Sequence, residues 1–205
     1  MMMRNFLALP GLAVGSLLAL GHPDGPAADW NVDASHTEIN FSVRHFFTPV
    51  SGSFHAYEIE LDFDPERPER SSVKVEVDVA SIDTGNEKRD DHLRSADWFD
   101  AARHPHIRFE SSTVRQVGED RYLATGTLTI KETRRKFELP ITLLGIQDIP
   151  EPMRPMLGGI SRVASFEAAA ELDRRDFGVG VGSWAETAIV GSEVRIAIAV
   201  EVNRS

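Results

Sequence analysis

Residues 73–79 read Val73-Lys74-Val75-Glu76-Val77-Asp78-Val79, an unbroken alternation of valine and charged side chains. Because successive side chains of a β-strand point to opposite faces, this period of two predicts a strand with one apolar face and one polar, solvent-exposed face. Six other segments alternate in the same way: 39–43, 57–63, 107–109, 137–143, 166–172 and 194–202. Many such strands in one domain predict an all-β sandwich or a closed barrel.

The alternation is interrupted at two places. Apolar residues occupy even positions over 50–54 and odd positions over 57–63, so we expect a bulge near His55 and Ala56, where the strand turns a corner. After residue 79 the spacing of apolar residues changes from the period of a strand to that of a helix. Thr84-Gly85-Asn86-Glu87 has the spacing of a capping box, and apolar residues follow at helical spacing. We therefore expect one inserted helix over residues 86–101.

The first 28 residues are expected to lie outside the folded domain. Arg4 precedes an apolar run over 6–20, which is shorter than the about 20 residues that span a bilayer. We expect residues 1–28 to be a cleaved signal peptide with a short N-terminal segment; an uncleaved membrane anchor is the alternative. Residues 29–205 then form one domain with its own core, in a periplasmic or secreted protein.

Composition argues against several classes of function. Lys and Arg number 22 against 32 Asp and Glu, a formal net charge of −10 that would repel nucleic acid and anionic surfaces. The absence of cysteine excludes disulfides, thiolate metal sites and a cysteine nucleophile. Neither Gly-x-Ser-x-Gly nor His-Glu-x-x-His occurs, and His104 and His106 have no identifiable third metal ligand. We therefore expect no metal, no cofactor and no nucleic-acid partner.

Charged residues gather in two short segments. Arg89, Asp90 and His92 lie on the expected helix, and Arg174 and Asp176 follow a strand. Near the mouth of a barrel, a planar guanidinium can bind the polar head group of a ligand. An Arg–Asp pair can instead clamp the helix to a loop, and both interpretations stay open.

Several spaced motifs resemble the YceI-like family, which is described as lipocalin-like and polyisoprenoid-binding. They follow the family order along nearly the whole of residues 29–205, and the longest is the most specific. The motifs are Asp33-x-x-His36-Thr37, Phe41-x-Val43-x-His45, Arg89-Asp90-x-His92-Leu93-x-Ser95-x-Asp97-Trp98-Phe99-Asp100, Arg174-x-Asp176-Phe177-Gly178 and Val190-Gly191-x-Glu193-Val194. The chain departs from the pattern with Thr37 for Ser, Trp98 for Phe and Glu132 for Gly.

The resemblance implies a closed antiparallel, lipocalin-like β-barrel of about eight strands that holds an amphiphilic lipid, such as a polyisoprenoid or an isoprenoid quinone. It also implies a bacterial periplasmic or secreted carrier or store, with the membrane only as the source of the ligand, and it suggests a homodimer. The apolar lining that we predict comprises strand residues and three residues of the expected helix that cap the cavity. The strand residues are Phe41, Val43, Phe54, Val75, Val77, Phe109, Leu128, Phe137 and Phe166, and the capping residues are Leu93, Trp98 and Phe99. The residues predicted to bind the head group or to act as a clamp are His45, Arg89, Asp90, His92, Arg174 and Asp176.

Two other functions remain open. One is an enzyme that acts on a lipid inside the barrel, with His45 or His92 as the base. The other is a ligand-free stress or interaction protein whose interior is solid, because a filled barrel core would use the same apolar residues. The volume of the interior distinguishes this last possibility from a carrier.

Overall fold

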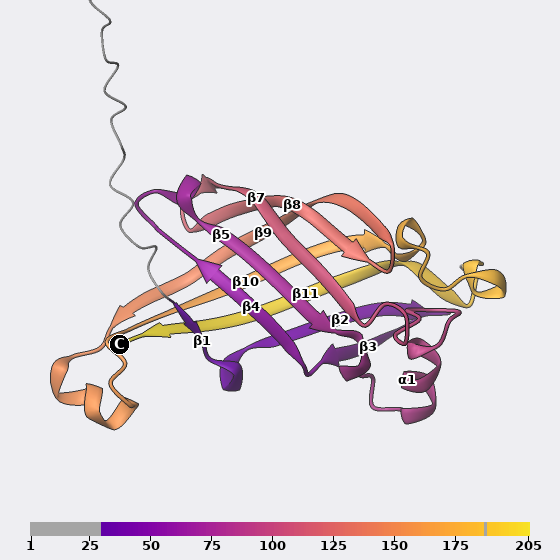
Figure 1. The fold of residues 1–205 in the computed structure, drawn as a ribbon, viewed down its shortest axis with the longest axis horizontal. Helices are drawn as coiled ribbons and strands as arrows, with labels where there is room; N and C mark the ends of the chain where they lie inside the picture. Colours follow the sequence, from indigo (N-terminus) through magenta and orange to yellow (C-terminus); the bar gives the residue numbers. More distant parts are fainter. Residues whose placement is uncertain (1–29, 187) are drawn as a thin grey trace, which may run out of the picture.

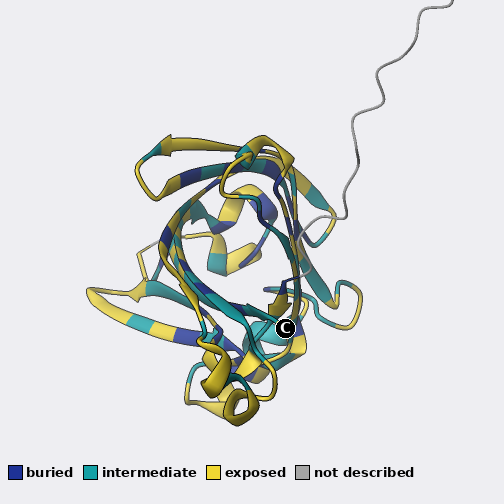
Figure 2. Cartoon of the chain, turned by 90° about the vertical axis from the view of Figure 1, so that its left-hand side faces the viewer, coloured by how far each residue is buried: buried dark blue, intermediate teal, exposed yellow. Residues whose placement is uncertain are grey.

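The computed structural model describes residues 30–186 and 188–205, and they form one antiparallel sheet that curls around an apolar interior (Figures 1 and 2). The expected leader over residues 1–28 lies outside the described residues. The all-β class is confirmed. The strands are β1 (Asn31–Val32), β2 (Glu38–His45), β3 (Thr48–Phe54), β4 (Tyr57–Asp62), β5 (Ser72–Asp78), β6 (Ile82–Asp83), β7 (His106–Gly118), β8 (Arg121–Ile130), β9 (Thr133–Asp148), β10 (Arg162–Asp173) and β11 (Val190–Arg204).

The expected closed barrel of about eight strands is not confirmed. Hydrogen bonds connect the strands in the order β4-β5-β7-β8-β9-β10-β11-β2-β3-β6, with β1 paired to β11, so that the path has β4 and β6 at its ends. The number of strands is larger than expected because the parity switch at His55 and Ala56 separates β3 from β4. A short 3-10 turn, Val79–Ser81, separates β5 from β6 in the same way. At this corner the two segments remain joined, by His55 N to Ser81 O and Asp78 N to Ala56 O.

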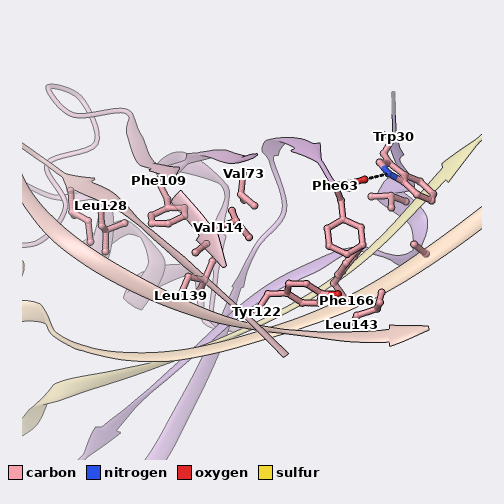
Figure 3. Packing of buried hydrophobic residues seen from close by; sticks show 14 of the residues in the cluster. Trp30, Phe63, Val73, Phe109, Val114, Tyr122, Leu128, Leu139, Leu143 and Phe166 are labelled. Atoms are coloured by element: carbon pink, nitrogen blue, oxygen red, sulfur yellow. Dashed lines mark hydrogen bonds between the residues drawn. The ribbon is translucent and has the colours of Figure 1, made fainter. Parts of the chain in front are cut away.

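Side chains connect the β4 end of the sheet to the segment that enters β1 and β2. Trp30 Nε1 donates to Phe63 O over 3.2 Å, which Figure 3 shows as a dashed line, and Tyr57 Oη donates to Thr37 O. Phe63 also lies edge-on to Tyr122 and Phe166, at ring-centroid distances of 5.2 and 5.0 Å (Figure 3). These contacts hold the curled sheet together where its backbone hydrogen bonds end.

The strand registers explain why one parity faces inward. β10 and β11 pair without a shift from Arg162 opposite Arg204 to Asp173 opposite Glu193. A shift of one residue would move every apolar side chain to the outer face, so the buried face sets the register. Between β7 and β8 the backbones approach so closely that a Cβ at Gly126 would lie 2.2 Å from Glu110 O.

The inserted helix is shorter than predicted. α1 (Glu87–Arg94) begins after Asn86, whose side chain accepts a hydrogen bond from Arg89 N at 3.1 Å. The expected capping box at Thr84 is therefore wrong, since the cap lies two residues further along. The helix ends because Ser95 turns to an extended conformation and its Oγ donates to His92 O, and residues 96–99 and 101–103 form turns.

The remaining helices are 3-10 segments: Ala34–His36, Pro68–Arg70, Val79–Ser81, Glu151–Leu157, Arg174–Phe177 and Gly182–Ala185. Figure 1 shows α1 and the loop before β11 at one end of the sheet, and residues 151–157 at the other. Within the described ranges, no helix has the length and hydropathy needed to cross a bilayer.

Candidate functional site

The curled sheet encloses an apolar cavity of about 160 Å³ beside α1. Eleven of the twelve residues predicted to line the interior surround it: Phe41, Val43, Phe54, Val75, Val77, Leu93, Trp98, Phe99, Phe109, Leu128 and Phe137. The twelfth, Phe166, borders a second cavity of about 60 Å³ nearer to β4. The structure therefore brings the predicted apolar set together, and its role in binding stays a prediction.

Sequence reasoning missed other residues of the wall. Ile196 and Ile198 lie on the inward parity of β11, and Leu139 lies on that of β9, so alternation alone would have found all three. Val179 follows the end of β10 and carries no periodic signal. Only two residues of the wall are polar, Asn40 and Arg174.

The two cavities are neighbours that share part of their walls. Val75, Leu139 and Ile198 border both of them. An apolar cavity of about 150 Å³ stays dry and accommodates a molecule of the size of benzene. The larger cavity therefore has room for about six carbon atoms, and the smaller cavity lies beside it.

Arg174 lies in the cavity wall as a brace for the loop that leads into β11. Its guanidinium carbon lies 5.1 Å from the centre of the Trp98 ring, a cation–π contact. Burial lowers the pKa of Arg174, which is 3% exposed. All five of its N–H groups are used: Nε donates to Gly191 O (2.9 Å), Nη1 to Val179 O (2.8 Å) and Gly180 O (3.1 Å), and Nη2 to Trp184 O (2.6 Å) and Val190 O (3.0 Å). No N–H group of Arg174 remains to bind a head group.

Arg89 and Asp90 form a second, separate brace. The buried Asp90 carboxylate accepts hydrogen bonds from Thr84 N (3.0 Å) and Thr84 Oγ1 (2.5 Å). Arg89 donates to Thr84 Oγ1 (2.7 Å) and Thr84 O (2.8 Å) from an exposed position. Both residues therefore hold the start of the helix against the strand before it, and neither borders the cavity.

The other three predicted polar residues lie outside the cavity. His45 is exposed at the end of β2, beside the Phe46 ring at 4.8 Å. The His92 ring lies 4.9 Å from Trp184 and does not border the cavity. Asp176 is exposed, and its backbone oxygen accepts from Arg135 at 3.4 Å. Of the six residues, Arg174 alone reaches the cavity wall.

A group of possible metal ligands lies away from the cavity. Ligand atoms of Asp33, His36 and Glu201 lie within 4.8 Å of one another. His36 Nδ1 bonds to Asp33 at 3.0 Å, which lowers the pKa of Asp33 and raises that of His36. The pair His104 and His106 does not converge, because the two rings contact different carboxylates, those of Glu132 and Glu76.

Comparison with known proteins identifies the family. The model of the YceI-like domain matches residues 30–202. The chain belongs to the YceI-like family. Among curated YceI-like relatives, a UPF0312 protein of Azotobacter vinelandii is 34% identical, over 83% of this chain and 86% of its own length. Protein YceI of Escherichia coli is 31% identical, over 84% and 86%.

Solved structures share the fold. BcnA of Burkholderia cenocepacia has a TM-score of 0.74 at 29% identity, covering 83% of this chain and 99% of that one. A polyisoprenoid binding domain from Saccharophagus degradans, implicated in plant cell wall breakdown, has a TM-score of 0.61 at 11% identity, over 86% and 98%. At that identity the likeness establishes the fold alone.

Proposed function

We propose that this YceI-like protein binds a long-chain amphiphilic lipid, of the polyisoprenoid or isoprenoid-quinone type, with its hydrocarbon tail inside the curled sheet. The protein then carries or stores this lipid in the periplasm or outside the cell. The observation that supports the proposal is the cavity of about 160 Å³, whose wall is apolar apart from Asn40 and Arg174. Burial of hydrocarbon there removes apolar surface from water.

The size of the cavity indicates how binding depends on the tail. About six carbons at about 0.8 kcal/mol each give roughly 5 kcal/mol before ordering costs, which corresponds to a dissociation constant of about 0.2 mM at best. A longer tail that also enters the second cavity buries more hydrocarbon and therefore gains more binding free energy. Tight binding of a long-chain lipid therefore requires both cavities, and we expect Val75, Leu139 and Ile198, which border both, to adjust when such a tail binds.

Two further observations favour a carrier over the other functions. A ligand-free role rests on a solid interior, and the interior holds two cavities. An enzyme would need a base that reaches its substrate, and neither His45 nor His92 borders the larger cavity. The name of the Saccharophagus degradans domain adds that a protein of this fold is described as binding polyisoprenoids.

Native mass spectrometry after purification from a host with membranes tests the proposal. We expect a bound lipid mass that denaturation releases. Ile196→Trp fills the cavity from β11 and should abolish lipid retention, whereas Ala197→Trp, on the exposed face of the same strand, should retain it. A protein that stays empty and takes up no prenyl or acyl ligand would refute the proposal, as would equal retention by the two variants.

A further inference from the structure

The turn between β2 and β3 presents two phenylalanines to solvent. Phe47 is 91% exposed, more than any other large hydrophobic side chain among the described residues, and Phe46 is 53% exposed. Ile189 is also exposed and lies beside them, because Phe46 N donates to Ile189 O at 2.6 Å. We call Phe46, Phe47 and Ile189 the apolar tip. Single exposed apolar side chains are ordinary, but three that adjoin at the end of a hairpin need an explanation.

Neither the geometry of the turn nor the core explains these phenylalanines. His45 pairs with Thr48, so Phe46 and Phe47 form a two-residue hairpin turn. Such turns require a positive φ and therefore favour Gly, Asn or Asp. Phe46 nevertheless has a φ of 51°, and its hydrogen bond to Ile189 O fixes this left-handed backbone. The chain thus keeps bulky apolar side chains where a smaller residue would form the turn more readily, which points to a contact outside the folded chain.

The apolar tip lies close to one end of the larger cavity. Val43 of β2 and Val194 of β11 pair with each other, and both border this cavity. Phe46 follows Val43 by three residues, which is about 10 Å along an extended strand. Figure 1 shows the turn between β2 and β3 at the same end of the sheet as α1 and the loop before β11. A surface that receives the tip therefore comes close to this end of the cavity.

Few carboxylates surround the tip, although the chain as a whole is acidic. Residues 39–57 contain no Asp or Glu, whereas the whole chain has 32, and Arg44 and His45 adjoin the turn. Residues 177–190, which lead into β11, contain one acidic residue, Glu186. The charges of α1 balance, with Glu87, Asp90 and Asp91 against Lys88, Arg89 and Arg94. The tip can therefore approach phosphate-bearing head groups without strong local repulsion.

We propose that the apolar tip inserts into the head-group region of a phospholipid bilayer and docks the protein there, with this end of the cavity toward the membrane. The inference rests on the proposed lipid-binding function for its purpose, since the bilayer is the source of the hydrocarbon tail. Insertion removes the three side chains from water, yet the contact is no stronger than a single acyl anchor and is therefore reversible. A protein partner fits less well, because a stable interface buries about 800 Å² and about 20–30 residues on each side.

Co-sedimentation with phosphatidylcholine vesicles tests the docking. We expect the wild-type protein to bind them and Phe47→Ala to bind about tenfold more weakly, because the substitution removes one inserted ring. Phe47→Trp should bind at least as well as the wild type, since indole rings favour the membrane interface. Met156→Ala is the matched control and should leave vesicle binding unchanged, because Met156 is 85% exposed but lies in the 3-10 segment at the opposite end of the sheet (Figure 1).

Two variants separate the docking from the proposed function. Phe47→Ala should retain co-purified lipid but dock weakly, whereas Ile196→Trp, which fills the cavity, should dock as the wild type does but retain no lipid. A wild-type protein that docks but never retains lipid would support the docking and refute the proposed function.

Three results would overturn the docking and leave the proposed function standing. The first is a wild-type protein that does not sediment with the vesicles, or that sediments equally with Phe47→Ala. The second is binding that appears only when phosphatidylglycerol is added and does not depend on Phe47, since insertion of apolar side chains needs no anionic lipid. The third is a dimer that Phe47→Ala converts to a monomer without any vesicle binding, which would assign the tip to a second copy of the chain.

Discussion

Replacement of Arg174 by Met tests whether the buried guanidinium holds the loop before β11 in place. The substitution keeps an extended apolar side chain and removes five hydrogen bonds to backbone carbonyls. Three of the five carbonyls belong to buried residues, Val179, Gly180 and Gly191, and the other two to residues that water reaches in part. At about 1 kcal/mol for each buried carbonyl that loses its partner, we expect a loss of about 3 kcal/mol in the free energy of unfolding.

Denaturant unfolding followed by tryptophan fluorescence measures this loss, with Arg175→Met as the matched control. Arg175 is an exposed neighbour whose guanidinium pairs with Asp173 in solvent, so its loss should cost much less than the loss of Arg174. For a domain of this size, Arg174→Met should lower the melting temperature by about 6–12 °C. A loss below about 1 kcal/mol, or one equal to that of Arg175→Met, would show that the five hydrogen bonds do not brace the loop.

Three further predictions concern stability. Gly126→Ala should destabilise the protein by about 1–3 kcal/mol in denaturant unfolding, because its Cβ would meet the backbone of β7 at 2.2 Å; unchanged stability would mean that the strands can separate without cost. The Arg175 hydrogen bond lowers the pKa of Asp173 to about 2, so its stabilisation is present above pH 3.8 and is lost as the pH falls through 2. Asp173→Asn should therefore be less stable than the wild type at pH 7 and equal to it below pH 2, and a deficit that persists in acid would contradict this origin. The pKa of His36 is raised by Asp33, so its contribution is present below pH 6.5 and is lost as the pH rises through the raised value. His36→Gln should show a deficit in thermal unfolding at pH 6 that disappears at pH 9, and a deficit independent of pH would exclude the ion pair as its cause.

Alternation predicted the strands and the inner face because both follow from one local rule. Val75 and Val77 share a parity, and both face the cavity. The number of strands was harder to predict, because the parity switch at His55 and Ala56 fits a bulge within one strand as well as a break between two strands. The helix end also escaped prediction, since it depends on the Ser95 hydroxyl rather than on the period of apolar residues.

The polar part of the site could not be predicted from spacing. Arg174 and Asp90 were identified as candidates, but their partners are a run of carbonyls and Thr84, which only the fold brings to them. The volume of the cavities depends on how inward side chains fill the space, and the same apolar residues could have filled it completely.

Because the interior is divided into two neighbouring cavities that share Val75, Leu139 and Ile198, we expect the protein to distinguish guests by length. Affinity should not climb smoothly with each added methylene. The affinity should level off once the larger cavity is full. It should rise again only when the chain is long enough to bury carbons in the second cavity as well. For a homologous series of ligands, a plot of affinity against chain length would then show a plateau followed by a second rise. The chain length at which the second rise begins would give the longest chain that the larger cavity accommodates alone.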